Sequence, residues 1–523
     1  MFVVNDDIFH YQTTIIMKRL TQLLTKASIF SLILWAFTAC KSDNGGTTPT
    51  PIAPDLDFYV LSTGNQLSVF NAKNLGTAKS TLAISNLSAN DNIIAIDFRP
   101  ATGQLYGLGS SSRLYAIDLT SGRANPLGAT SFTPAIDGTA VGFDFNPTVD
   151  RIRLVTNKGQ NLRLHPELGT VAATDGVING ATTTITSAAY TENFAGSTTT
   201  ILYNIDPQTD MLYKQDPPNN GTLVMVGALG VDFSGDGGFD IGLNNAGLAI
   251  YGVSGKSTLF NINLTTGKAE SLGVVGTLTN AIGIAIAPIP VAYAVNDGNM
   301  LMIFNPENPV PISKAITGLA TGENVFGIDF RPATGQLIAL GSSNRLYILN
   351  TATGAATAIG AVPFSTLLTG TAFGFDFNPT VDRIRVVSNS GQNLRLNPND
   401  GTIAAVDAAL NPTSAKISAA AYTNNFAGST ATVLFDIDHV TGKLFKQDPP
   451  NAGTLVEVGS LGVMPTESNG FDIGGTSNKA WALLTVGGAT KLYSINLTSG
   501  VATAVGTYTF TGNYRGFAVG LGF

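Results

Sequence analysis

The sequence predicts an all-β protein built from repeated four-stranded sheets, and three observations support this prediction. Short apolar segments, rich in β-branched and aromatic residues, alternate with turns of Gly, Asn, Pro and Ser. The 58 glycines and 24 prolines have no collagen period, so many turns between strands account for them. No long window beyond residue 56 has the 3.6-residue period of an amphipathic helix.

The N-terminal segment indicates export and attachment to a membrane. We expect residues 1–16 to precede the true start, because two aspartates there suit no signal sequence, and translation to begin at Met17. Residues 17–39 have a basic beginning and then an apolar run that is short for a permanent membrane span. With small residues before Cys40, this segment resembles a bacterial lipoprotein signal, which implies cleavage before Cys40 and its acylation.

The chain after the signal begins with a polar tether, residues 40–56, that is rich in Gly, Thr and Pro. Cys40 is the single cysteine of the chain, so the folded part can contain neither a disulfide nor a cysteine metal site. The resemblance implies that Cys40 anchors the protein to the outer membrane, on its periplasmic or its external face.

The rest of the chain is a duplication. DFRPATGQL begins at Asp97 and again at Asp329, and GFDFNPTVDRIR occupies residues 142–153 and 374–385. We therefore predict two copies of one unit, over residues 57–289 and 290–523.

A shorter repeat inside each unit predicts its architecture. Each unit contains five blocks of four short strands, a spacing that favours a β-propeller. One block is split, because three of its strands open the unit and the fourth closes it. Pairing the two ends in this way would remove open sheet edges. The sequence thus predicts two tandem five-bladed propellers of four-stranded blades, with one ten-bladed ring as the alternative.

The motifs DFRPATGQLYGLG, GFDFNPTVDRIR, GQNLRL and KQDPPN together resemble a bacterial family known as domain of unknown function 4394, DUF4394. The resemblance covers almost the whole chain after the tether. It implies a secreted or envelope-attached propeller and no particular activity.

Alignment of the first strand of each block places aspartates at one equivalent position. Three blocks of each unit carry the aspartate, and the other two carry alanine, at Ala189 and Ala285 in the first unit. The six aspartates are Asp97, Asp144, Asp240, Asp329, Asp376 and Asp472. We predict that they accept backbone N–H bonds and fix the connection to the neighbouring sheet. Calcium binding and catalysis are the alternatives, since oxygen-only clusters suit hard cations.

Three arginines near the repeated motif suggest a second polar cluster. Arg151 and Arg153 lie two residues apart in a strand, so they share a face. We expect them to bind carboxylate or carbonyl partners inside the sheet, with Asp144 or Asp150 close enough in sequence to serve, and Arg163 to join across the hairpin. An anion site made from this cluster is the alternative.

The sequence favours a non-catalytic binding protein on the bacterial envelope, with a protein or glycan as ligand. No Ser-His-Asp set and no histidine metal cluster can be built from the repeat, and we predict no cofactor. The net charge of -7, without a basic block, argues against nucleic acid as a partner. Two alternatives stay open: a glycoside-active enzyme that uses the aspartates, although Trp481 is the one tryptophan after the signal, and a calcium-stabilised adhesin.

Overall fold

A computed structural model describes residues 53–180 and 184–523. The predicted signal, Cys40 and almost all of the tether lie outside the described residues. These described residues form one compact unit. Among the described residues, no helix has the length and apolar character needed to cross a membrane.

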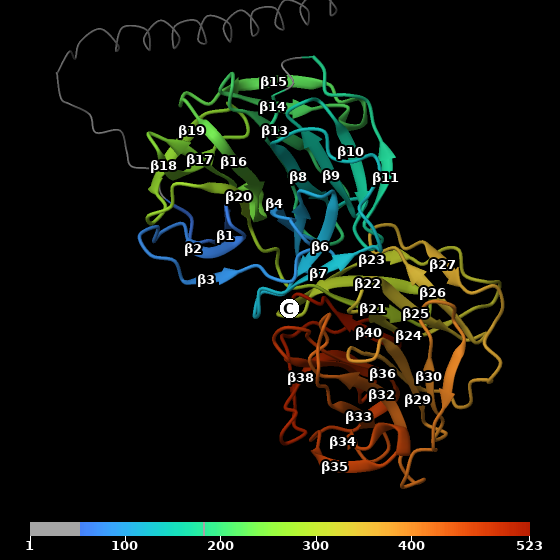
Figure 1. The fold of residues 1–523 in the computed structure, drawn as a ribbon. Helices are drawn as coiled ribbons and strands as arrows, with labels where there is room; N and C mark the ends of the chain where they lie inside the picture. Colours follow the sequence, from blue (N-terminus) through green and yellow to red (C-terminus); the bar gives the residue numbers. More distant parts are fainter. Residues whose placement is uncertain (1–52, 181–183) are drawn as a thin grey trace, which may run out of the picture. The chain divides into compact units, whose positions relative to one another are not determined.

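The described chain folds into ten four-stranded antiparallel sheets (Figure 1). Five sheets come from the first copy. Their strands are β1 Asp57–Ser62, β2 Gln66–Asn71, β3 Ser80–Ala83, β4 Ile93–Phe98, β5 Leu105–Gly109, β6 Arg113–Ile117, β7 Ala124–Leu127, β8 Val141–Asn146, β9 Arg151–Thr156, β10 Asn161–His165, β11 Thr170–Thr174, β12 Ser187–Tyr190, β13 Leu202–Asp206, β14 Met211–Gln215, β15 Leu223–Ala228, β16 Ser234–Ile241, β17 Gly247–Val253, β18 Lys256–Ile262, β19 Ala269–Val274 and β20 Ala281–Ala285.

The second copy supplies the other five sheets. Their strands are β21 Ala292–Asn296, β22 Met300–Asn305, β23 Asn308–Ala315, β24 Val325–Phe330, β25 Leu337–Gly341, β26 Arg345–Leu349, β27 Ala356–Ile359, β28 Phe373–Asn378, β29 Arg383–Ser388, β30 Asn393–Leu396, β31 Ile403–Val406, β32 Ile417–Tyr422, β33 Leu434–Asp438, β34 Lys443–Gln447, β35 Leu455–Ser460, β36 Pro465–Ile473, β37 Ala480–Val486, β38 Ala489–Ile495, β39 Ala502–Ala504 and β40 Tyr514–Val519. Three short 3₁₀ turns complete the described elements: η1 Pro218–Asn220, η2 Leu243–Asn245 and η3 Pro450–Ala452.

Eight of the sheets are formed by four consecutive strands, whereas two join the ends of a copy. The sheet order β20-β1-β2-β3 pairs Val60 with Ile284, and β23-β22-β21-β40 pairs Ala294 with Phe517. In Figure 1 the green β20 accordingly lies beside the blue β1. These are the two end-to-end pairings that the split block predicts, and they leave no first strand without a partner.

The first strands of neighbouring sheets contact one another in a closed order. In the first copy β4, β8, β12, β16 and β20 follow each other, and β20 contacts β4 again; β24, β28, β32, β36 and β40 do the same in the second copy. Apolar side chains fill the space between neighbouring sheets, as where Phe143 and Phe145 of β8 pack with Leu108 and Leu114. The arrangement is all-β and consistent with propeller-like folds.

Candidate functional site

The three aspartates of the first copy meet where β4, β8 and β16 approach one another. Asp97, Asp144 and Asp240 each offer a carboxylate oxygen, and these oxygens lie within 4.8 Å of one another. All three side chains are buried, with at most 1% of their surface exposed. The alignment of the sequence repeat thus identified residues that are neighbours in space, although they are separated by 47 or more positions along the chain.

Each of these carboxylates accepts a backbone N–H from the first strand of the next sheet or from the residue just after it. Asp97 Oδ2 accepts from Phe145 N at 2.7 Å, Asp144 Oδ1 from Tyr190 N at 3.0 Å and Asp240 Oδ2 from Ile286 N at 2.5 Å. In every case the donating residue comes directly after the aspartate or alanine that occupies the equivalent position in its own strand. The carboxylates therefore hold neighbouring first strands together, as the sequence predicts.

The second copy repeats this geometry with Asp329, Asp376 and Asp472, whose carboxylate oxygens also lie within 4.8 Å of one another. Asp329 Oδ2 accepts from Phe377 N, Asp376 Oδ1 from Tyr422 N and Asp472 Oδ2 from Val519 N. We call the two clusters the first and the second acid triad.

Burial changes the protonation of both triads. It raises the pKa of Asp97 and Asp144 well above the ordinary value of an aspartate, and repulsion from the other carboxylates adds to this rise. The pKa of Asp240 rises to about 7, because its backbone hydrogen bonds partly offset the cost of burial. Asp329, Asp376 and Asp472 follow the same pattern, with the pKa of Asp472 at about 7. The triads therefore retain protons at neutral pH.

The donor set of a triad could hold a hard cation, but it is a poor calcium cage. Calcium takes six to eight oxygen ligands, commonly including water. Here the three carboxylates are buried, and each already accepts at least one backbone N–H bond. The raised pKa values of these carboxyl groups mean that bound protons reduce the negative charge of the cluster.

The arginine cluster forms, but with a different carboxylate from the expected ones. Arg153 Nη1 lies 2.7 Å from Asp175 Oδ2, and Arg163 binds the same carboxylate through two nitrogens at 2.8 and 2.9 Å. The prediction that Asp144 or Asp150 pairs with Arg153 is wrong. Asp144 is directed to the next sheet, and Asp175 follows the outer strand of the same sheet, opposite both arginines.

Asp150 instead belongs to a buried ion pair that the sequence analysis missed. Its carboxylate accepts two bonds from the fully buried guanidinium of Arg99, which also binds Glu167 at 2.7 Å. Arg151 donates only to the backbone oxygen of Asp150, at 2.7 Å. Arg99 lies in the DFRP segment and Asp150 in the TVDR segment, and both segments recur at the same separation in the second copy, with Arg331 and Asp382. This repeated pair of opposite charges is the signal that could have suggested the ion pair.

A further buried acid distinguishes the two copies. Asp436 stands on β33 where the first copy has Asn204 on β13. Asn204 Nδ2 donates to Gln215 Oε1 at 3.2 Å, whereas neither oxygen of Asp436 has a partner, and Gln447 Oε1 is also unpaired. Burial raises the pKa of Asp436 to about 8. A protonated Asp436 can donate to Gln447 as Asn204 does to Gln215.

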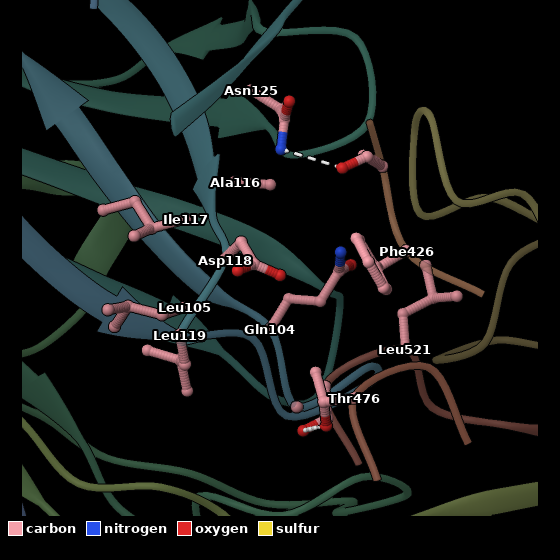
Figure 2. A pocket seen from close by; sticks show the side chains of 13 residues that line it. Gln104, Leu105, Ala116, Ile117, Asp118, Leu119, Asn125, Phe426, Thr476 and Leu521 are labelled. Atoms are coloured by element: carbon pink, nitrogen blue, oxygen red, sulfur yellow. Dashed lines mark hydrogen bonds between the residues drawn. The ribbon is translucent and has the colours of Figure 1, made fainter. Parts of the chain in front are cut away.

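Two hollows adjoin the acid-bearing sheets and differ in size. A cavity of about 260 Å³ lies near the starts of the first strands of the first copy, lined among others by Ile94, Val141 and Ile282. Figure 2 shows a smaller crevice, where Gln104 and Asp118 face Phe426 and Asn125 donates to the backbone oxygen of Ala427 at 3.3 Å. Its volume of about 30 Å³ suffices for little more than a water molecule.

Solved structures offer only distant likeness to this chain, and all three that follow come from B. thetaiotaomicron. The extracellular domain described as that of the one-component system BT4673 is 14% identical, covers 87% of this chain and 66% of its own, and has a TM-score of 0.24. A second structure, described as the extracellular domain of the hybrid two-component system BT4673, is 13% identical; the match covers 89% of this chain and 60% of that one, with a TM-score of 0.23. The extracellular domain of the hybrid two-component system BT3049 is 11% identical; the match covers 87% of this chain and 59% of that one, with a TM-score of 0.25. None of the curated proteins matches significantly.

The family assignment comes from a family model. The model described as domain of unknown function DUF4394 matches residues 66–285 and again residues 300–518. The two matches cover most of the chain and coincide with the two copies found from the sequence repeat. The chain therefore belongs to the DUF4394 family and contains two tandem copies of its domain.

Proposed function

We propose that this protein is an envelope-anchored bacterial lipoprotein that binds a ligand without catalysis, through two tandem five-bladed propellers. The closed order of contacts among the five first strands of each copy supports two separate rings over one ring of ten blades. In a ten-bladed ring, β20 would contact a first strand of the other copy instead of returning to β4.

The observation that carries the non-catalytic proposal is the burial of both acid triads. A glycosidase needs one carboxyl group that protonates the leaving group and a second that attacks or activates water, and both must reach the sugar. Asp97, Asp144 and Asp240 are at most 1% exposed, and each is occupied by a backbone N–H of the neighbouring sheet. These carboxyl groups connect neighbouring strands and cannot reach a sugar, which argues against the alternative of a glycoside-active enzyme that uses them.

The location rests on the sequence of the N-terminal segment. Residues 17–39 and Cys40 form the lipoprotein signal, and the following tether separates the anchor from the first strand at Asp57. A lipid anchor would hold both propellers at the outer membrane, where the ligand could be a glycan or a protein.

Membrane fractionation of a Cys40→Ala variant tests the anchoring part of the proposal. We expect wild-type protein in the detergent-soluble membrane fraction and labelled by a palmitate analogue, and the variant in the soluble fraction without label. A variant that stays as firmly bound to the membrane would refute the anchor.

An assay on a panel of polysaccharides tests the absence of catalysis. We expect no release of reducing ends by the wild type. Activity that is present in the wild type and disappears in Asp144→Asn, while the variant remains folded by circular dichroism, would favour the glycoside-active enzyme instead.

A further inference from the structure

The two copies differ at one equivalent position of all five first strands. This position lies three residues before the aspartate or alanine described above, near the start of each strand. In the first copy it holds Ile94, Val141, Thr186, Gly237 and Ile282, and in the second it holds Phe326, Phe373, Ser418, Asn469 and Arg515. The substitutions replace small and aliphatic side chains with larger or charged ones at four of the five places.

In the first copy, these five residues line the cavity of about 260 Å³, which we call the first-copy pocket. Its wall is aliphatic, and its rim carries Asn92, Thr139 and Asp236. Gly237 is required here, because a Cβ atom at this position would lie 2.4 Å from the Cδ1 of Tyr251. The hydroxyl of Tyr251 is held in place by Thr186 at 3.0 Å and by Ser187 at 2.8 Å.

In the second copy, the equivalent side chains fill this space. The rings of Phe326 and Phe373 stack with centroids 5.0 Å apart and planes at 15°. The guanidinium carbon of Arg515 lies 5.6 Å from the centre of the Phe326 ring, and Asn469 donates to Ser418 at 2.8 Å. The hollows that remain measure only about 30 and 10 Å³. The same fold is therefore open in one copy and closed in the other.

We propose that the first-copy pocket binds a small organic amine with a compact aliphatic body, and that the second copy has no such site. This inference rests on the proposed binding function and specifies the class of ligand and the site where it binds. The volume lies just below the roughly 300–1,000 Å³ of typical ligand pockets, so the ligand must be small.

The lining determines the chemistry of the ligand. Ile94, Val141 and Ile282 offer aliphatic surface, and the lining contains no aromatic ring on which a sugar could stack. Asp236 is the one ionisable residue of the lining, and it is exposed to solvent at the rim. A protonated amine can pair with this carboxylate while the aliphatic body enters the pocket, whereas a carboxylate ligand would be repelled.

Three probes with the same ring test the assignment: cyclohexylmethylamine, cyclohexylmethanol and cyclohexanecarboxylate. Binding to the full chain in a non-ionic detergent is measured by ligand-observed saturation-transfer NMR titration. We expect the amine to bind more tightly than the alcohol and the carboxylate most weakly. Asp236→Asn should weaken amine binding roughly two- to fivefold, the range of an exposed ion pair, and leave alcohol binding unchanged.

Exchange of the differing residues between the copies provides matched variants. Ile94→Phe/Val141→Phe/Ile282→Arg places the stack of the second copy in the first-copy pocket and should abolish amine binding. Phe326→Ile/Phe373→Val/Arg515→Ile opens the second copy and should add a second site, roughly doubling the saturating signal. Circular dichroism verifies that each variant is folded, and Asp236→Asn, a surface change, keeps the test valid if a triple variant does not fold.

The proposal is overturned if no probe binds the wild type in a saturable way, or if Asp236→Asn leaves the amine affinity unchanged. Amine binding that survives in the folded first triple variant would also overturn it. Such a result would exclude the first-copy pocket as the amine site. It would not bear on the membrane anchor, which fractionation of Cys40→Ala tests, or on the absence of catalysis, which the polysaccharide assay tests.

Discussion

At the residue scale, the acid triads act as buried connectors between sheets. Asp144 lies in one cluster with Asp97 and Asp240 and accepts the N–H of Tyr190 with Oδ1. Its raised pKa follows from burial and from repulsion by both neighbours. A group whose folded-state pKa lies above its unfolded value holds a proton that the unfolded chain releases, so its contribution to stability falls as the pH rises from about 4 toward the folded pKa.

We therefore expect Asp144→Asn to be tolerated and Asp144→Ala to be damaging. Asparagine retains an oxygen that can accept the N–H of Tyr190 and brings no charge, so the free energy of unfolding should change by less than about 1 kcal/mol. Alanine leaves that buried N–H without a partner, which costs about 1 to 3 kcal/mol. Urea unfolding at pH 7 measures both. Equal damage by both changes would mean that the carboxylate is needed in its ionised form.

Asp436 offers a second test of a protonated buried acid. Its pKa of about 8 predicts that its contribution to stability is lost progressively as the pH rises from about 4 to 8, on the order of 1.4 kcal/mol per pH unit at most. Asp436→Asn, which copies Asn204, should stabilise the protein more at pH 8 than at pH 5.

The matched control for Asp436 is the reverse change in the first copy. Asn204→Asp should lower the free energy of unfolding more at pH 8 than at pH 5, because it creates the same buried acid opposite Gln215. Urea unfolding of each of the two variants at pH 5 and at pH 8 measures these changes in the free energy of unfolding. A gain from Asp436→Asn that does not depend on pH would show that Asp436 is not the titrating group.

At the scale of elements, the strands that close each copy depend on the carboxylate before them. Asp472 binds Val519 N on β40, and Asp240 binds Ile286 N just after β20, both at 2.5 Å. The two bonds have the same length, so the carboxylates of Asp472 and Asp240 should contribute similarly to the local stability of the strands that close each copy.

We expect Asp472→Ala to accelerate amide hydrogen exchange in the peptide that contains β40. A loss of about 1.4 kcal/mol in local stability corresponds to a tenfold increase in exchange rate. The equivalent Asp240→Ala should accelerate exchange in β20 by a similar factor, because it removes a bond of the same length. Hydrogen exchange with mass spectrometry compares the two peptides. Unchanged exchange in either peptide would contradict this view of the closing strands.

At the scale of the whole molecule, the two copies share one fold and differ in particular contacts. Arg99 is fully buried and donates to the backbone oxygen of Gly335 at 2.9 Å, and Tyr293 donates to that of Ala101 at 2.9 Å, so these bonds join residues of the two copies. The equivalent of Arg99, Arg331, is also buried and pairs with Asp382. Divergence thus affects the contact between copies and the openness of the pocket, while both acid triads are retained.

The retained triads predict how the whole protein responds to calcium. Because the carboxylates are buried and have raised pKa values, neither added calcium nor a chelator should move the melting temperature at pH 7 by more than about 1 °C. Differential scanning calorimetry of the wild type and of Asp144→Asn/Asp376→Asn tests this. A rise of several degrees with calcium in the wild type, absent in the double variant, would support the calcium-stabilised adhesin instead.

Local sequence patterns predict much of this organisation. The duplication, the four-strand blocks, the closing strands and the equivalence of Asp97, Asp144 and Asp240 all follow from repeated segments, because turns and strand alternation depend on neighbouring residues. The partner of Arg153 could not be predicted from such local patterns. Arg153 meets Asp175 because of how the outer strand returns, and Asp144, nearer in sequence, is directed elsewhere.

By itself, the sequence determined the family, the repeat and the set of aspartates that share one place in it. Only the tertiary structure decided that these carboxylates are buried and bind the backbone of the next sheet. It also decided that the space beside Ile94 is a cavity, whereas the equivalent space beside Phe326 is almost filled. The physical reason is that strand formation is a local property, whereas burial, protonation and cavity volume depend on side chains that meet only when all five sheets of a copy are assembled.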